Sequence, residues 1–161
     1  MASSRVSRIS LCLFLGSTLA VPAVAAEGAD EAEQEQLIFT HVLDGAELDV
    51  YTPLPDEEFT PEVEEFHVTG ENPYTGDEQA IEDGAQLYRQ WCQACHMPDG
   101  SGRMGPALND DRFRHEEAAT DKGEFEIIYG GAAGAMQAFG DRIEQDGILR
   151  LMAFTETLRR D

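Results

Sequence analysis

The pentapeptide Cys92-Gln93-Ala94-Cys95-His96 is the stretch that decides how the rest of this sequence is interpreted. Two cysteines three positions apart, followed at once by a histidine, form the C-x-x-C-H signature of covalent c-type haem attachment. In such a site both thiols become thioethers to the porphyrin, and the histidine becomes an axial ligand of the iron. Residues at positions i, i+3 and i+4 of a helical turn share one face. Cys92, Cys95 and His96 can therefore all meet one side of a flat macrocycle, and we predict that they hold haem in this way.

Two other kinds of site use a similar cysteine pair. Trp91 precedes the pair, and W-C-x-x-C also occurs in thioredoxin-type dithiols, which follow a strand and open a helix. The residues before the motif, 78–91, contain no β-branched run and indicate a helix, which disfavours the dithiol. A zinc site would need a second Cys or His pair at ligand spacing, and no cysteine follows Cys95. The pattern therefore favours covalent haem.

The first 26 residues have the composition of a secretory signal peptide. Arg5 and Arg8 form a short positive region, residues 9–21 are apolar, and residues 23–26 offer small side chains for cleavage. The apolar run is too short for a membrane span, although a retained membrane anchor is the alternative. We expect a periplasmic protein of 135 residues, in which Cys92 and Cys95 are the only cysteines.

Charge is distributed unevenly along the chain. The net charge is −21, and removal of the two arginines of the signal peptide would make it −23. Residues 27–88 include 19 acidic side chains and no Lys or Arg. This composition disfavours nucleic acid and anionic lipid as partners and favours a basic protein partner attracted by electrostatic steering. An acidic surface suited to high salt explains the same composition, and the sequence does not separate the two.

The portion before the haem motif is expected to be irregular. Residues 27–36 are acidic and predicted to be disordered. In residues 37–76, alternating apolar positions flank Asp44-Gly45, a type I′ turn signal that predicts a β-hairpin. Four prolines then predict an irregular acidic extension, with room for a helical turn over 61–66. Such a hairpin could cover a haem edge, contact a partner or serve only in packing.

Residues 77–161 are expected to form a mainly α-helical haem domain. Apolar spacing predicts a helix over 77–91, in which Gly84 indicates close approach of another backbone. A second helix is predicted over 121–129, opened by Thr120 or Asp121 and ended by glycines, and a third over 145–159. Residues 97–113 and 130–140 contain too many glycines and prolines to be regular.

A second axial ligand must come from a segment far from the motif. Met136 fits best, because it lies 40 residues beyond His96 on a loop of small residues. The other methionines lie next to His96, on the loop that follows it, or on a helix face that indicates core. His115 is the alternative and would give bis-histidine ligation. Pro106, with its fixed φ, is well suited to aim a carbonyl at the second ring nitrogen of His96.

These residues together resemble a class I cytochrome c. Gly84, Tyr88 and Cys92 fall at the steps of four seen in the first helix of that family, and residues 151–154 are similar to the core of its last helix. Four further stretches, including the haem motif, narrow the resemblance to the cytochrome c-L family: residues 72–76, 92–96, 105–110 and 128–136. That family accepts electrons from periplasmic quinoprotein methanol dehydrogenases and related alcohol dehydrogenases.

The resemblance covers residues 38–158 and implies a monomeric one-electron carrier, not an enzyme. It implies one haem c on Cys92 and Cys95, with His96 and Met136 as iron ligands. A dehydrogenase containing pyrroloquinoline quinone (PQQ) would be the donor, and another cytochrome c or an oxidase the acceptor, with no stable membrane insertion. Some members bind calcium, for which this sequence does not place ligands. Some have a second methionine just after the distal one, and Phe139 stands near that place in this chain.

Two alternatives to this function stay open at the level of sequence. The first is a carrier for another pathway, such as respiration or sulfur oxidation, in which the haem chemistry would be the same. The second is a haem enzyme or gas sensor, which needs an open or labile coordination position on the iron.

Overall fold

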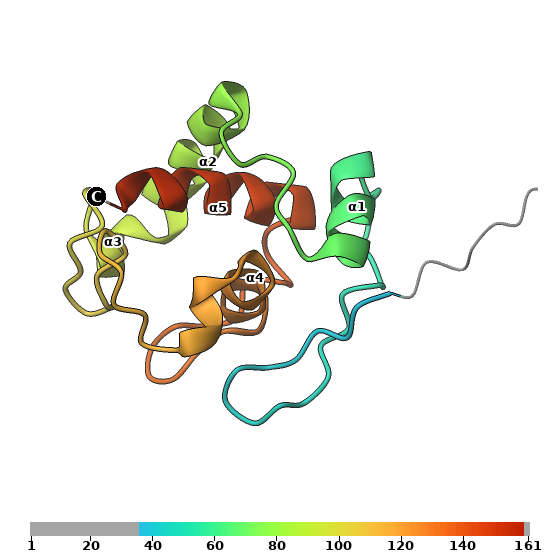
Figure 1. The fold of residues 1–161 in the computed structure, drawn as a ribbon, viewed down its shortest axis with the longest axis horizontal. Coiled ribbons are helices and arrows are strands. Elements are labelled where there is room, and N and C mark those ends of the chain that lie inside the picture. Colours follow the sequence, from blue (N-terminus) through green and yellow to red (C-terminus); the bar gives the residue numbers. More distant parts are fainter. Residues whose placement is uncertain (1–35, 160–161) are drawn as a thin grey trace, which may run out of the picture. The chain divides into compact units, whose positions relative to one another are not determined.

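The computed structural model of this chain describes residues 36–159. The predicted signal peptide and residues 27–35 of the acidic N-terminus lie outside the described residues. The described range contains five α-helices and one 3₁₀ helix (Figure 1): α1 (Pro61–Thr69), α2 (Glu78–Trp91), α3 (Gln93–His96), η1 (Glu116–Ala119), α4 (Asp121–Gly130) and α5 (Gln145–Leu158). No strand occurs among these residues, so the expectation of a mainly α-helical fold is confirmed.

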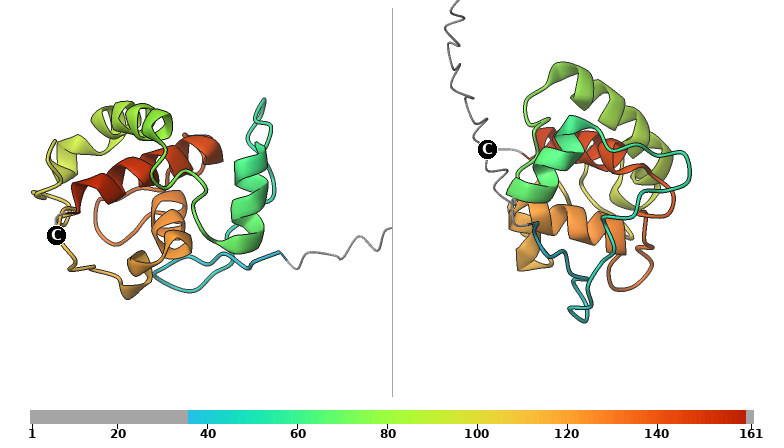
Figure 2. Two further views of the ribbon diagram at one scale, coloured as in Figure 1. Left: turned by 45° about the horizontal axis from the view of Figure 1, so that its top comes forward. Right: turned by 90° about the vertical axis from the view of Figure 1, so that its right-hand side faces the viewer.

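Helices α2 and α5 cross in close contact and form the centre of the fold (Figure 2). A Cβ atom at Gly84 would overlap the backbone carbonyl of Arg150 on α5. The ring centroids of Tyr88 and Phe154 lie 5.1 Å apart beside this crossing. The predicted close approach of another backbone at Gly84 is therefore confirmed, and its physical basis is the absence of a side chain.

The helices begin and end where local sequence signals predict. The Asp77 side chain accepts a hydrogen bond from the amide of Ala80 (2.7 Å), and the Thr120 hydroxyl accepts one from Gly123 (3.1 Å). Gly131, with φ of +81°, ends α4. Each of the three predicted helices agrees with its observed bounds to within one residue. Helix α1 is longer than the turn predicted there.

The predicted β-hairpin is wrong as a regular element. The described residues contain a single antiparallel bridge, between Thr40 and Glu47. A type I′ turn needs positive φ at both central residues, but of Asp44 and Gly45 only the glycine has it. Backbone pairing is confined to the two bonds beside this bridge, from His41 to the carbonyl of Ala46 (2.7 Å) and from Leu48 to that of Phe39 (2.9 Å). In this register the amide of Thr40 points away from Glu47, and it donates to the carboxylate of Glu126 on α4 (2.6 Å).

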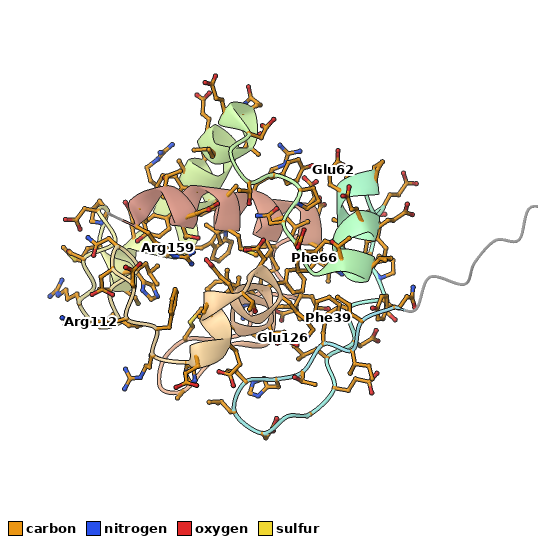
Figure 3. The ribbon with its side chains drawn as sticks, viewed as in Figure 1. Phe39, Glu62, Phe66, Arg112, Glu126 and Arg159 are labelled. Atoms are coloured by element: carbon orange, nitrogen blue, oxygen red, sulfur yellow. The ribbon has the colours of Figure 1, made fainter. Side chains whose placement is uncertain are left out.

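Aromatic rings attach the N-terminal segment to the helices. The Phe39 ring lies 5.6 Å from the rings of Phe66 and Phe125, and those two rings lie 4.8 Å apart. Figure 3 shows Phe39 and Phe66 where the N-terminal segment, α1 and α4 meet. Phe39, Phe66 and Phe125 are at most 1% exposed. The segment is therefore part of the hydrophobic core and not a loose extension.

Polar side chains add further links between the N-terminal segment and α5. Gln145 donates from Nε2 to the carbonyl of Val50 (2.7 Å), and its Oε1 lies 2.8 Å from Nε2 of His67. The Asn72 side chain donates to the carbonyl of Leu149 (2.8 Å). All three side chains are buried. These bonds join residues 77 to 95 positions apart, so they could not be inferred from local spacing.

Candidate haem site

A cavity of about 240 Å³ brings the predicted site residues together. Cys92, Cys95, His96, Pro106 and Met136 all line it. Three segments supply them: the junction of α2 and α3, the loop that follows α3, and the loop between α4 and α5. The structure thus places at one site residues that span 45 positions of sequence.

The cysteine motif continues directly from α2. The amide of Cys92 donates to the carbonyl of Tyr88 (2.9 Å), and the amides of Cys95 and His96 donate to the carbonyl of Cys92 (both 3.0 Å). Both cysteines and the histidine therefore lie on one helical turn. A helix precedes the motif, where a thioredoxin-type site would have a strand.

The environment of the first thiol also disfavours dithiol chemistry. Burial, helped by the neighbouring Cys95, raises the pKa of the Cys92 thiol to about 12. A redox-active dithiol needs a lowered pKa, because the thiolate is the nucleophile. Cys92 in this setting is a poor nucleophile at neutral pH.

The imidazole of His96 has a fixed orientation. Its Nδ1 lies 2.9 Å from the carbonyl oxygen of Pro106, so the ring N–H donates to that carbonyl. Nε2 has no hydrogen-bond partner among the described residues, and its lone pair is left available at the cavity. A Cβ atom at Gly105 would lie 2.5 Å from the ring, so glycine is needed here for the ring to occupy this place. The Pro106 carbonyl thus faces the His96 ring, and the role of His96 as an iron ligand stays a prediction.

The loop after α3 is tied back onto the motif by its own backbone. Gly102 donates to the carbonyl of His96 (3.0 Å), and Gly105 donates to that of Cys95 (3.1 Å). The Tyr88 hydroxyl donates to the carbonyl of Met97 (2.7 Å), whose φ is +65°. These bonds place the Pro106 carbonyl without using the side chains that line the cavity.

Met136 lies on a loop that is fixed at both ends. The amide of Ala132 donates to the carbonyl of Met136 (3.1 Å), which closes the loop. The chain then returns to α4, where Phe139 and Gly140 donate to the carbonyls of Ile128 and Tyr129 (3.1 and 3.0 Å). Met136 is half-buried against the core. Met152, in contrast, is a core residue at 2% exposure, as its helix face predicted.

The cavity also has a cationic side, which sequence reasoning missed. Arg112, Arg114 and Arg159 line it, and so does His115, which the sequence suggested only as an alternative iron ligand. The sequence did contain a sign of this cationic side, because two arginines and a histidine occur within residues 112–115 of a strongly acidic chain. Arg159, which directly follows α5, could not have been assigned to this side of the cavity without the fold.

Residues 36–159 lack two further features. They contain no group of three or more His, Cys, Asp or Glu side chains arranged to hold a metal ion. None of their helices is both long enough and apolar enough to span a membrane.

The chemical groups that line the cavity fit a covalently attached haem. It offers two thiols on one helical turn, an imidazole with an available nitrogen, and a thioether on a separate loop. The rest of its lining is mainly apolar and includes Leu108, Ile128 and Leu151. Hydrophobic walls with a few convergent polar groups are typical of cofactor sites.

The helix crossing at Gly84 and the haem motif at the end of the first helix define the class of protein: a class I c-type cytochrome. A family model described as cytochrome c oxidase, cbb3-type, subunit III matches residues 79–154. Cytochrome c-L of Methylorubrum extorquens is 33% identical over 145 residues, which cover 89% of this chain and 74% of that protein.

Two solved structures are similar over most of their length. Cytochrome cL of the marine methylotrophic bacterium Methylophaga aminisulfidivorans has a TM-score of 0.73 at 38% identity, with 77% of this chain and 82% of that one covered. Cytochrome cL of Hyphomicrobium denitrificans has a TM-score of 0.76 at 37% identity, with 79% and 76% covered. The chain belongs to the cytochrome c-L family. It is an electron-transfer protein with a haem c cofactor.

Proposed function

We propose that this protein is a periplasmic mono-haem cytochrome that accepts single electrons from a PQQ-dependent methanol or alcohol dehydrogenase. One observation carries the proposal: a single cavity is lined by Cys92, Cys95, His96 and Met136 in a chain of the cytochrome c-L family. When bound, haem supplies a one-electron Fe(II)/Fe(III) couple. The downstream acceptor would be another cytochrome c or an oxidase.

Each site residue has a distinct role in this proposal. Cys92 and Cys95 would hold haem through thioethers, and His96, through Nε2, and Met136, through its sulfur, would be the ligands of its iron. The bond from His96 Nδ1 to the Pro106 carbonyl (2.9 Å) fixes the ring and makes its other nitrogen a stronger donor. A methionine ligand and an apolar surrounding both raise the reduction potential.

Substitution of Met136 by alanine tests the iron ligands. We expect the purified Met136→Ala protein to keep covalent haem but to lose the methionine-to-iron charge-transfer band. It should also bind CO or cyanide rapidly and have a lower reduction potential. Met104→Ala is the matched control, because Met104 lines the same cavity but is 71% exposed. A Met136→Ala spectrum identical to that of the wild type would contradict this assignment and favour an enzyme or sensor.

The donor is proposed from the family and from the acidic surface. Helix α1 and the start of α2 carry exposed carboxylates, among them Glu64, Glu65, Asp77 and Glu78. Redox encounters use small and weak interfaces, in which complementary charge mainly raises the association rate. The acidic side chains would increase the rate of encounter with a basic patch on the dehydrogenase.

Stopped-flow mixing with a PQQ methanol dehydrogenase and methanol tests the donor. We expect haem reduction, and we expect its rate to fall as ionic strength rises, because salt screens exposed charges. Glu64→Gln with Glu65→Gln on α1 should slow reduction more than Glu116→Gln with Glu117→Gln on η1. Rates that do not depend on salt would refute the steering, and an absence of reduction would refute the donor.

The second candidate, a carrier for a respiratory pathway, is favoured by one observation. The family model described as an oxidase subunit matches residues 79–154, the haem domain alone. The cytochrome c-L relatives match 77–89% of the chain, which favours the first candidate. Reduction by a respiratory donor and not by the dehydrogenase would reverse this preference.

The periplasmic location rests on the predicted signal peptide over residues 1–26. N-terminal sequencing of the exported protein should find Glu27 as its first residue. An N-terminus upstream of Arg5 on a membrane-bound product would instead indicate a retained anchor.

A further inference from the structure

His115 has a buried polar atom without a partner. Its Nε2 atom makes no hydrogen bond with any described residue. The residue directly precedes η1 in extended conformation (φ −118°, ψ 125°), and it is among the residues that line the haem cavity. A buried donor that no protein group satisfies is costly, so a native structure that keeps one usually offers it to something else. The cavity is what lies next to it.

The same side of the cavity collects positive charge. Arg112 and Arg114 line the cavity and make no side-chain hydrogen bond or ion pair within residues 36–159. Arg159 reaches it from α5, held by Glu124 (2.5 Å) and by the ring of Phe113, 5.2 Å from its guanidinium carbon. Figure 3 shows Arg112 and Arg159 on the same side of the molecule, near the C-terminal end of α5.

The carboxylates that line the cavity do not neutralise this cluster. Glu124 and Asp110 are the two. Glu124 is engaged by Arg159 and by the hydroxyl of Thr155 (2.6 Å), and Asp110 accepts a hydrogen bond from the amide of Arg112 (2.9 Å). The guanidinium groups of Arg112 and Arg114 therefore have no side-chain partner within residues 36–159, and the buried Nε2 atom of His115 has none either.

We propose that His115, with Arg112 and Arg114 beside it, binds a propionate carboxylate of haem. Haem is an apolar plate that carries two carboxylates, and this cavity has apolar walls with one cationic side. A hydrogen bond from a ring N–H to a carboxylate is charge-assisted and strong. The negative charge of a propionate near the iron stabilises Fe(III). A hydrogen bond that offsets this charge therefore raises the reduction potential. The assignment rests on the proposed haem at Cys92, Cys95 and His96.

The test uses the haem-loaded protein with His115→Phe, His115→Gln and Arg114→Gln. Arg103→Gln is the matched control, because it removes the same charge from a neighbouring exposed position that does not line the cavity. Four quantities are measured: covalent haem content, the methionine-to-iron band, the reduction potential, and the hyperfine-shifted proton resonances of the propionate methylenes.

We expect His115→Phe to keep haem and the methionine band, to lower the reduction potential and to shift the propionate resonances. His115→Gln keeps an N–H donor and should restore much of the potential. Arg114→Gln should lower the potential more than Arg103→Gln. The two glutamine variants keep the assignment testable if the phenylalanine protein does not fold.

Two results would overturn the assignment alone. One is an unchanged potential with unchanged propionate resonances in a haem-loaded His115 variant. The other is a change of iron coordination in His115→Phe, which would show that His115 is an iron ligand in the wild-type protein. A wild-type protein without haem on Cys92 and Cys95 would instead overturn the proposed function, and this assignment with it.

Discussion

The N-terminal segment, residues 37–76, and the loops of the haem cavity, 97–115 and 131–140, are both largely irregular, but different bonds attach them to the rest of the fold. The N-terminal segment is bound by distant side chains: Glu126 accepts from the Thr40 amide (2.6 Å), and Asp121 accepts from the Asn72 amide (2.7 Å). The cavity loops are bound by their own backbone, as in the bond from Gly102 to the carbonyl of His96 (3.0 Å).

This difference indicates what each region is for. In the N-terminal segment, the polar and aromatic side chains are used in packing, so the segment completes the core of the protein. Around the cavity, backbone bonds carry the structure and the side chains stay available for the cofactor. The two regions also differ in charge: residues 27–88 carry no Lys or Arg, whereas arginines line the cavity. Substitutions in each region should therefore have separable effects.

Gly84→Ala should damage both regions together, because both are built on the crossing of α2 and α5. The added methyl group would overlap the carbonyl of Arg150, and the helices would have to separate. We expect a loss of about 3 kcal/mol in the free energy of unfolding, measured in urea. Glu82→Ala, on an exposed position of α2, should change it by less than about 0.5 kcal/mol. Equal stability of the two variants would refute the close crossing.

Glu126→Ala should release the N-terminal segment and spare the haem. It leaves the buried amide of Thr40 without an acceptor and Lys122 without its ion pair. The expected loss is about 2 kcal/mol, with faster hydrogen exchange at Thr40 and an unchanged haem spectrum. The control is Glu116→Ala, an exposed carboxylate without side-chain bonds, which should have no effect. A changed haem spectrum in Glu126→Ala would show that the two regions are coupled.

Gly105→Ala should have the converse effect. Its Cβ would lie 2.5 Å from the His96 ring and push it away from the Pro106 carbonyl. We expect a destabilisation of about 1 kcal/mol and a shifted reduction potential, with normal hydrogen exchange at Thr40. Ser101→Ala in the same loop is the control. An unaltered potential would mean that the His96–Pro106 bond does not tune the site.

The pH dependence of stability should report on the N-terminal segment through His67. Burial lowers the pKa of His67, outweighing the hydrogen bond with Gln145 and the charges of Glu57 and Glu64. Below the ordinary value of 6.5 the unfolded chain therefore binds a proton that the folded chain resists, so stability falls as pH falls through that range. The pKa of Asp146 is lowered from 3.8, mainly by its hydrogen bond with Arg150 against the cost of burial, so its contribution is lost only in stronger acid.

Urea unfolding at a series of pH values measures this effect, with His67→Gln as the comparison. The wild type should lose stability between about pH 7 and pH 5, and His67→Gln should lose less. Parallel curves for the two proteins would rule out His67 as the titrating group.

Asp44→Ala should change little, although Asp44 belongs to the strongest turn signal of the N-terminal segment. Its side chain is 68% exposed, accepts a hydrogen bond from the amide of Ala46 (3.0 Å) and lies 3.2 Å from Nδ1 of His41, both of them local contacts. We expect a change below about 0.5 kcal/mol. A loss as large as that of Glu126→Ala would mean that the turn, and not the distant carboxylate, holds the segment.

Local signals in the sequence determined the helices and the haem motif. Asp77 and Thr120 cap helices through bonds to amides three residues away, and Gly131 ends a helix through its own backbone conformation. The C-x-x-C-H motif is likewise confined to one turn. Such signals could be interpreted without the fold, because the atoms involved are neighbours in the chain. The close approach of α5 at Gly84 could be predicted as well, because a glycine inside a helix has no side chain to keep another backbone away.

Only the tertiary structure decided how distant groups pair. Regular pairing in the predicted hairpin stops at one bridge, and the outward-facing amide of Thr40 bonds to a carboxylate 86 residues away. The buried Nε2 of His115 and the arrival of Arg159 at the same cavity are also products of the fold, since the end of α5 meets the loop before η1 at Phe113. Periodicity and spacing record which face of an element is apolar. They do not record which polar groups meet when two faces pack, and in this protein those meetings hold the N-terminal segment and form the cationic side of the cavity.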